Sequence, residues 1–255
     1  LIFASKRWNN KDYLEEAQVI LNDIWKVEVY ELNGKYYMLA GNWAKTEPQP
    51  TINPSYFSFA AYPIFAEVDP SHPWMELKDT SYEVLEAATI GNLDKEKSAL
   101  LPPDWVNLDP KTGNIIAVVH PDKATHFSDD AIRIPFRVAL DWEWHKDERA
   151  KVYLEKLSFL ENEWETRGKI SRAYGHDGTI ESDDESNSTY GTLVPYFKVV
   201  NPKIAEAIYF RKLAYLYSPD TEDFKEDIGY YAQNMGWFGM AAYQGKLLNL
   251  YNIHE

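Results

Sequence analysis

The side chains of this sequence that are able to do chemistry are carboxylates and aromatic rings. The six histidines are scattered, and no HExxH, GxSxG, P-loop or GxGxxG motif occurs, so no metal, serine-hydrolase or nucleotide site is indicated. Aromatic residues make up 15% of the chain. Aromatic faces stack on the apolar faces of sugar rings, and carboxylates do acid and base work at a glycosidic bond. The composition therefore fits a sugar-processing site, although a helical protein that merely packs Trp and Tyr in its core is the more common source of it.

Composition excludes several other classes of function. The 255 residues carry a formal net charge of −14, which argues against nucleic acid or an anionic membrane as a partner. The chain has no Cys, which excludes disulfides, thiolate nucleophiles, zinc fingers and iron–sulfur clusters. No apolar run approaches the roughly 18 residues that span a bilayer. The apolar residues Leu1 to Ala4 are too few, and lack the basic flank, for a signal peptide.

The elements that must position these side chains are mostly helices. Apolar residues recur at three- and four-residue spacing over 11–26, which predicts an amphipathic helix with Asn9 or Asn10 as its N-cap. Asn33 and Gly34 within 27–39 predict a hairpin with a type I′ turn. Further helices are expected at 56–65, 74–89, 131–145, 148–165, 202–217, 221–227 and 230–251, a short strand at 115–119, and a solvent-facing loop at 175–188. We therefore expect one predominantly helical domain of successive helix pairs, with small β-hairpin excursions on its loops.

Five segments of the chain stand out as motifs. They are LIFASKRW at 1–8, GNW at 41–43, NPSYFS at 53–58 with AAY at 60–62, LPPDWV at 101–106, and FSDDAIRIPFR at 127–137, which continues into ALD at 139–141 and DERA at 147–150. In this order they resemble the motifs of glycoside hydrolase family 8. The first is similar to the second half of the family signature, in which an Asp-rich segment leads into an apolar helix that ends in Trp. Each segment alone is a modest signal, but five in the family's order are a strong one.

The resemblance implies a fold and a reaction. Family members are (α/α)6 barrels that cleave β-1,4 bonds of cellulose, lichenan, xylan or chitosan with inversion, and no cofactor is implied. Inversion requires a protonated acid at the leaving oxygen and a carboxylate base that activates water, roughly 6.5–9.5 Å apart. In the common subgroup the base is the Asp that falls here on Asp130, and Arg133 matches the Arg that accompanies it. The simpler alternative for Asp130 is an N-cap of a helix that starts near Ala131, a role that Asp129 could also fill.

The resemblance also implies sugar contacts. Trp43 and Tyr56 fall where the family places aromatic rings that stack on sugar, and Tyr230 and Tyr231 lie where members bring a Tyr into the cleft. Position 129 is usually Tyr in the family, and Asp129 beside the base could raise the pKa of the base or alter a sugar subsite.

Two features bear on the choice of substrate. The acidic run at 183–185 could attract a cationic polymer such as chitosan, or it could be a solvated loop. An Asp at 130 argues against the chitosanase-type subgroup, in which the base is a Glu supplied from elsewhere in the chain. Glucan, lichenan, xylan, chitosan and an exopolysaccharide all stay open, with a β-glucan preferred.

The family's general acid, a Glu in an EGxSY-like segment, has no counterpart in this chain and would lie upstream of Leu1. We therefore expect 1–255 to form the C-terminal two-thirds of a single catalytic domain, with an N-terminal fragment of the same protein as a partner beside the β-linked polysaccharide. The expected function is that of an inverting endo-β-1,4-glucanase that acts outside the cell, and the isolated chain is expected to be inactive. The alternative is a non-catalytic carbohydrate-binding or scaffold protein on the same α/α toroid.

Overall fold

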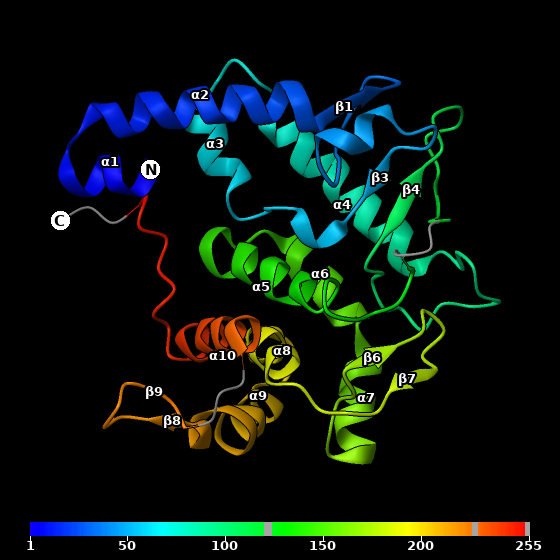
Figure 1. Ribbon diagram of the computed structural model, residues 1–255, viewed down its shortest axis with the longest axis vertical. Coiled ribbons are helices and arrows are strands. Elements are labelled where there is room, and N and C mark those ends of the chain that lie inside the picture. Colours follow the sequence, from blue (N-terminus) through cyan, green and yellow to red (C-terminus); the bar gives the residue numbers. More distant parts are fainter. Residues whose placement is uncertain (120–123, 226–228, 253–255) are drawn as a thin grey trace.

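The computed structural model describes residues 1–119, 124–225 and 229–252, and most of them are helical (Figure 1). In chain order the α-helices are α1 (Ile2–Trp8), α2 (Lys11–Glu28), α3 (Tyr62–Val68), α4 (Trp74–Ile90), α5 (Arg133–His145), α6 (Glu148–Lys156), α7 (Ser158–Arg167), α8 (Asn187–Val200), α9 (Pro202–Ile208) and α10 (Gly229–Tyr243). The strands are short, and they are β1 (Val29–Leu32), β2 (Lys35–Met38), β3 (Thr51–Ile52), β4 (Val106–Leu108), β5 (Ile115–Ala117), β6 (Ala173–Tyr174), β7 (Ile180–Ser182), β8 (Tyr217–Ser218) and β9 (Asp223–Phe224). They pair antiparallel as β1–β2, β3–β4–β5, β6–β7 and β8–β9. The expectation of a helical domain with small β excursions is confirmed.

Two predictions near the N-terminus are confirmed in detail. The helix α2 begins after Asn10, whose side chain accepts a hydrogen bond from the Asp12 amide at 2.9 Å. In the hairpin that follows, Asn33 and Gly34 have φ of 54° and 74°, the two positive values that a type I′ turn requires. Figure 1 shows α5 between this N-terminal group of elements and a C-terminal group that contains α8 and α10.

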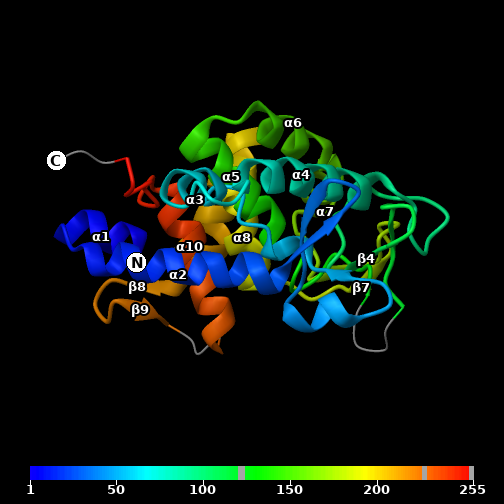
Figure 2. The same ribbon diagram turned by 90° about the horizontal axis from the view of Figure 1, so that it is seen from above.

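The helix α8, which the sequence analysis missed, lies inside the C-terminal half and packs against α5, α6, α9 and α10 (Figures 1 and 2). Every residue from Ser188 to Phe197 is buried. A helix that is buried all round has no polar face, so no helical periodicity marks it in the sequence. Pro195 within it also argues against a helix on local grounds. The loop expected at 175–188 therefore ends at Ser186, which caps α8.

Several other predicted elements are wrong or differ in their boundaries. The helix expected at 148–165 breaks at Leu157, where α6 ends and α7 begins, because the apolar periodicity continues across the break. The helix expected at 221–227 is wrong: Asp223–Phe224 is β9, with the Phe224 ring packed edge-on to Tyr217, and residues 226–227 lie outside the described part of the chain. The helix expected at 56–65 is α3, which begins only at Tyr62 and follows a 3₁₀ turn at Pro54–Tyr56, and the loop expected at 175–188 contains β7. The helix expected at 202–217 ends in π and 3₁₀ turns at Tyr209–Leu213 and Ala214–Leu216, and the helix expected at 230–251 ends at Tyr243.

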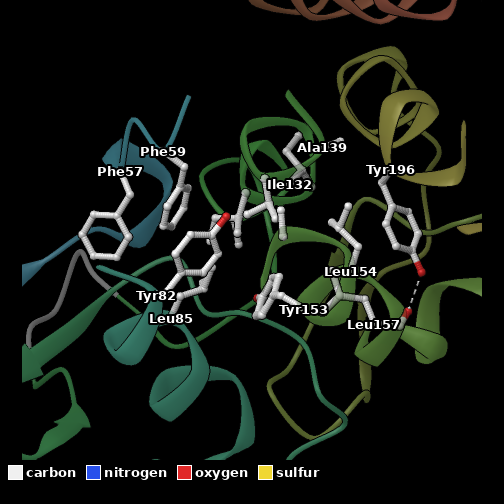
Figure 3. Packing of buried hydrophobic residues seen from close by; sticks show 14 of the residues in the cluster. Phe57, Phe59, Tyr82, Leu85, Ile132, Ala139, Tyr153, Leu154, Leu157 and Tyr196 are labelled. Carbon is white, nitrogen blue, oxygen red and sulfur yellow. Dashed lines mark hydrogen bonds between the residues drawn. The ribbon is translucent and has the colours of Figure 1, made fainter. Parts of the chain in front are cut away.

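The core combines aromatic packing with a buried ion cluster. In Figure 3, side chains from α4, α5, α6 and α8 meet at the centre of the molecule, where the Tyr196 hydroxyl donates to the Leu157 carbonyl at 2.9 Å. Beside them, Lys78 of α4 is 1% exposed, and its Nζ lies 2.8 Å from the carboxylate of Asp141 and 2.9 Å from that of Asp147. The ALD and DERA segments therefore supply ion pairs that join α4, α5 and α6, and these pairs fix the helix that follows the candidate base.

Within residues 1–119, 124–225 and 229–252, none of the helices is long and apolar enough to cross a membrane. In the same residues no group of three or more His, Asp or Glu side chains is arranged to hold a metal ion.

Candidate active site

Asp130 and Arg133 lie together where α5 begins. Arg133 is the first residue of α5, and its Nη2 donates to the Asp130 carboxylate, while its Nε lies 3.3 Å from the Asp130 carbonyl oxygen. The Asp130 side chain keeps 27% of its surface exposed, so a bound molecule can reach it. A charge-assisted hydrogen bond of this kind orients the carboxylate that accepts it. The structure thus brings together the two residues that the resemblance assigned to the chemistry.

Neither Asp130 nor Asp129 caps α5, whose N-cap is Ile132 and which has no side-chain cap; the amides of the turn before the helix are bound by Asp104 instead. The Ala131 amide donates to Asp104 Oδ1 at 2.6 Å, and the Ser128 amide donates to the same oxygen at 3.1 Å. The Asp130 carboxylate is bound by Arg133 instead. The N-cap interpretation of Asp130 and Asp129 is therefore wrong. Sequence reasoning missed Asp104 as a site residue, and its only signal was its place in the LPPDWV segment.

Arg133 also connects Asp130 to the segment that carries Tyr56. Its Nη2 donates to Ser55 Oγ at 2.7 Å, and its guanidinium lies 5.5 Å from the centre of the Tyr56 ring, within the range of a cation–π contact. Ser55 is fixed in turn by Asn53, whose side-chain oxygen accepts from the Ser55 amide at 3.0 Å and from its hydroxyl at 2.6 Å. Tyr56 is partly exposed, and Trp105 meets its ring edge-on. Tyr56 is thus positioned beside the candidate base.

Asp129 pairs with a second arginine. Its carboxylate accepts from Arg172 Nη2 at 2.8 Å and from Nε at 3.4 Å, and this hydrogen bond raises the pKa of the Arg172 guanidinium. The Asp129 carbonyl accepts from the Tyr231 hydroxyl at 2.5 Å. Burial raises the pKa of Tyr231 to about 12, so this hydroxyl remains a donor at neutral pH. Asp129 therefore links the turn that carries Asp130 to Arg172, beside β6, and to α10.

A cleft of about 590 Å³ opens beside this turn. Its walls come from the turn before α5, the start of α8 and the start of α10, and it is lined by Asp129, Asp130, Arg133, Arg172, Ser186, Ser188, Gly229, Tyr230, Tyr231 and Ala232. Tyr230 is the most exposed of the aromatic candidates, with 84% of its surface free. Of the predicted site residues, all but Trp43 and Tyr56 line this cleft, and Tyr56 is joined to it through Arg133.

Trp43 does not line this cleft. It lies in a 3₁₀ turn at Asn42–Thr46 and borders a separate hollow of about 520 Å³, which Thr51, Asn107 and Val119 also line. Its ring is partly exposed. Trp43 and the residues around Asp130 thus line different hollows.

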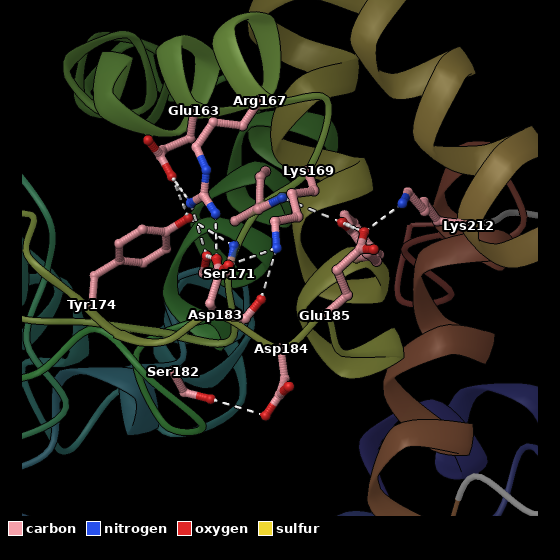
Figure 4. A network of polar contacts seen from close by, with 12 residues as sticks. Glu163, Arg167, Lys169, Ser171, Tyr174, Ser182, Asp183, Asp184, Glu185 and Lys212 are labelled. Carbon is pink, nitrogen blue, oxygen red and sulfur yellow. Dashed lines mark hydrogen bonds and ion pairs between the residues drawn. The ribbon is translucent and has the colours of Figure 1, made fainter.

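Two of the three carboxylates in the acidic run at 183–185 are bound by cations of the chain itself, and Asp184 accepts from Ser182 (Figure 4). Lys169 Nζ lies 2.9 Å from the Asp183 carboxylate, which Arg167 and Ser171 also bind, and these hydrogen bonds lower the pKa of Asp183. Glu185 accepts from Lys212 and from the Tyr190 hydroxyl. The run therefore fastens the segment before α8 to its neighbours, and these contacts do not support its interpretation as a docking patch for a cationic polymer.

The sequence is similar to known endoglucanases. Residues 1–199 match the model of glycosyl hydrolases family 8. Endoglucanase C of Ruminiclostridium cellulolyticum is 31% identical over 169 residues, which cover 64% of this chain and 32% of that protein. An endoglucanase of Cellulomonas uda is 31% identical over 140 residues, which cover 54% of this chain and 36% of that protein. The chain thus spans about a third of the length of the curated relatives that it matches.

Solved structures share the fold. The β-1,3-1,4-glucanase of Paenibacillus sp. X4 superposes with a TM-score of 0.76 at 19% identity, over 95% of this chain and 63% of that chain. A xylanase of Teredinibacter turnerae, solved as a catalytic mutant with xylohexaose, gives a TM-score of 0.70 at 19% identity, over 96% of this chain and 63% of that chain. These relatives are (α/α)6 barrels, which confirms the expected fold class. Because the family model matches residues 1–199 of 255, the chain belongs to glycosyl hydrolases family 8.

Proposed function

We propose that this chain supplies the general base and part of the cleft of an inverting endo-β-1,4-glucanase. The observation that carries the proposal is the exposed carboxylate of Asp130, which Arg133 holds at the edge of a cleft lined by Tyr230 and Tyr231. The endoglucanase names of the relatives from Ruminiclostridium cellulolyticum and Cellulomonas uda support this class of reaction. No cofactor is needed for it.

In the proposed reaction, Asp130 accepts a proton from water while the oxygen of that water bonds to the anomeric carbon. The bond from this carbon to the leaving sugar oxygen breaks on the opposite face of the ring, and the leaving oxygen takes a proton from the general acid. The two carboxyl groups must stand roughly 6.5–9.5 Å apart so that the water fits between base and sugar. The cleft of about 590 Å³ beside Asp130 is large enough for a sugar unit and this water.

The general acid, in this proposal, comes from polypeptide outside the 255 residues. Among the described residues, the carboxylates that line the cleft are Asp129 and Asp130, which are neighbours in sequence, and Arg172 engages Asp129. The matched solved structures also extend well beyond this chain, which covers 63% of each of the two described above. We therefore take 1–255 as the C-terminal two-thirds of one catalytic domain, with an N-terminal fragment of the same protein as its partner.

Exposed apolar side chains offer a surface for that partner. Trp8 of α1, Val19 and Ile20 of α2 and Trp237 of α10 all expose large parts of their side chains. Exposed apolar side chains of this size are candidates for a contact with further polypeptide. Additional helices of the same domain would cover it.

The proposed substrate contacts divide between two places. Tyr56, Tyr230 and Tyr231 would stack on the sugar unit next to Asp130, and Asp129 would hydrogen-bond its hydroxyl groups. Trp43 would contact a more distant unit of the same polymer, because it borders a different hollow. A polymeric substrate of this size does not cross a membrane, and for this reason we also propose that the protein acts outside the cell.

A non-catalytic carbohydrate-binding protein is the second candidate. Within the described residues, the carboxylates that line the cleft are Asp129 and Asp130, and Arg172 pairs with Asp129. This pairing favours the second candidate, because it leaves Asp130 as the one cleft carboxylate that Arg172 does not bind, whereas inversion needs two carboxyl groups. A pure binding protein, however, has no need of a carboxylate that an arginine orients toward its ligand. That argument favours the enzyme.

Release of reducing ends from carboxymethylcellulose, lichenan, xylan and chitosan tests the proposal. We expect no hydrolysis by the isolated 255-residue chain, and hydrolysis of the β-glucans by the complete protein with a first product in the α-anomeric form, as inversion requires. Hydrolysis by the isolated chain would show that the acid lies within it. A β-anomeric first product would contradict inversion, and binding without hydrolysis by the complete protein would favour the second candidate.

A further inference from the structure

A buried carboxylate, Asp104, binds the turn from which Asp130 projects. Asp104 Oδ1 accepts from the Ser128 amide at 3.1 Å and from the Ala131 amide at 2.6 Å, and its Oδ2 accepts from the Ser128 hydroxyl. Ser128 and Ala131 are the residues on either side of the Asp129–Asp130 pair. One carboxylate thus fastens both ends of the four-residue turn that presents the candidate base.

Asp104 is itself held in place. Its amide donates to the His126 carbonyl at 2.7 Å, and the Trp105 amide donates to the Ala124 carbonyl at 3.1 Å. The chain then enters β4, the central strand of the β3–β4–β5 sheet. A turn tied to this support has little freedom, because two of its amides and one hydroxyl would lose their acceptor if the carboxylate moved.

The other hydrogen bonds of the turn hold less of it. The Ile132 amide donates to the Ser128 carbonyl at 3.0 Å, and the Arg133 amide donates to the Asp130 carbonyl at 3.1 Å, and both bonds are local. Long-range bonds also reach Asp129, whose carboxylate accepts from Arg172 and whose carbonyl accepts from Tyr231, but they hold one residue of the turn. The Asp104 carboxylate holds both ends of the turn, and it lies 27 positions before Ala131 in sequence.

The electrostatic setting of Asp104 differs from that of a surface carboxylate. Only 7% of the residue is exposed, and burial raises its pKa to about 6, although hydrogen bonds from Ser128 and Ala131 oppose the rise. The negative charge of Asp130 raises the pKa of Asp104 further, and the charge of Asp104 in turn raises the pKa of Tyr231. A buried anion next to a second anion costs stability. The hydrogen bonds that Asp104 accepts from Ser128 and Ala131 offset this cost, so the carboxylate is held here by its contacts with the turn.

We propose that Asp104 is a positioning residue, which fixes the turn at 128–131 so that the Asp130 carboxylate meets Arg133 and faces the cleft. The part of this inference that concerns catalysis rests on the proposed function. Asp104 does not line the cleft, so it acts through the turn that it holds. Asp129 keeps its own hydrogen bonds to Arg172 and Tyr231 when Asp104 is replaced, whereas the Asp130 carboxylate depends on the turn and on Arg133. Replacement of Asp104 should therefore slow the chemical step far more than it weakens sugar binding.

Three variants of the complete protein test the role in catalysis. In Asp104→Ala we expect kcat on lichenan to fall about 100-fold, the loss expected when a catalytic group is misplaced by about 1 Å, with KM unchanged within about threefold. Asp104→Asn should keep most of the activity, because its side-chain oxygen can still accept from both amides. Asp177→Ala is the matched control, since Asp177 also accepts from a turn amide, that of Thr179 at 3.1 Å, but lies outside the cleft. Wild-type kcat in Asp104→Ala, or a rise in KM at constant kcat, would overturn the proposal.

Amide hydrogen exchange of the complete protein provides a readout that needs no activity. Asp104→Ala should speed the exchange of the Ala131 and Ser128 amides by at least about 10-fold relative to the core helix α8, while Asp177→Ala should speed only the Thr179 amide. Unchanged protection at Ala131 in Asp104→Ala would overturn the positioning role. If the wild-type protein hydrolysed no glycan, the proposed function would fail, and this exchange experiment would still decide whether Asp104 fixes the turn.

Discussion

The guanidinium of Arg133 binds the carboxylate of Asp130 from the first turn of α5, three residues further along the chain. The same guanidinium binds Ser55 and lies over the ring of Tyr56, so segments far apart in sequence converge on one carboxylate. Other carboxylates of the chain, such as Asp183, pair with lysine or arginine away from the cleft. This convergence at a cleft is what separates Asp130 from the rest of a strongly acidic surface.

Replacing Arg133 by Lys tests whether the shape of the guanidinium or only its charge matters. Arg133 binds Asp130 and Ser55 through Nη2, and its Nε and guanidinium plane also contact the Asp130 carbonyl and the Tyr56 ring. Lys keeps the positive charge but has one compact ammonium on a flexible stem, so it cannot make these contacts in the same geometry. We expect kcat on lichenan to fall about 100-fold through misplacement of the base, with little change in KM. Arg211→Lys, at an exposed position of the turn after α9, is the control. Wild-type kcat in Arg133→Lys would show that charge alone is sufficient.

The pKa of Asp104 predicts how stability depends on pH. Burial raises this pKa from 3.8 to about 6, so the folded protein binds the proton more tightly than the unfolded chain does. The stability gained in this way is fully present below about pH 3.8 and is lost as the pH rises through 6, a change of about 3 kcal/mol. Asp104→Asn has no such proton to lose. Its free energy of unfolding, relative to that of the wild type, should therefore rise by about 2 kcal/mol between pH 4 and pH 6.5, which is most of this change. Urea denaturation across this range measures the difference, and a constant difference would contradict the prediction.

The buried ion cluster predicts a large loss of stability when one partner is removed. Lys78→Met leaves the buried Asp141 without its cation, and breaking a buried pair in this way typically costs about 3–5 kcal/mol. Lys35→Met removes one partner of an exposed pair with Glu83 and should cost less than about 1 kcal/mol. Urea denaturation of both variants makes the comparison. Equal losses would show that burial does not govern the strength of these pairs.

The close contact between α8 and α10 predicts that position 191 does not tolerate a side chain. A Cβ at Gly191 would overlap the backbone of Met235, so Gly191→Ala must push α10 away from α8. We expect a loss of about 1–3 kcal/mol in unfolding free energy. Because α10 carries Tyr230 and Tyr231, affinity for a cello-oligosaccharide should fall as well. Gly236→Ala on the same α10 meets only the movable Phe224 ring and should be tolerated. Equal thermal stability of the two variants would contradict this account of the contact.

The elements that could be predicted from the sequence are those specified by local patterns. The helix α2, its Asn10 cap and the Asn33–Gly34 turn each depend on residues close in the chain. The helix α8 could not be predicted, because its ten consecutive buried residues, Ser188 to Phe197, show no periodicity. Its environment is created by α5 and α10, which pack against it only in the folded chain.

The site was predictable to the extent that its residues fall in recognisable segments. The FSDDAIR segment indicated Asp130 and Arg133, and the fold brings them together. Asp104 was missed because its hydrogen bonds to Ser128 and Ala131 join parts of the chain that no local pattern connects. The pairing of Asp129 with Arg172, 43 residues later, was invisible for the same reason.

The kcat of Asp130→Asn in the complete protein tests the central claim most directly. Asn keeps the size of the side chain but cannot accept the proton of the attacking water, so we predict a loss on the order of 10²–10⁴-fold on lichenan. Affinity for a cello-oligosaccharide should stay close to that of the wild type, and Asp177→Asn, in a turn outside the cleft, should keep full activity. Full activity of Asp130→Asn would contradict the account, because another group would then be the base.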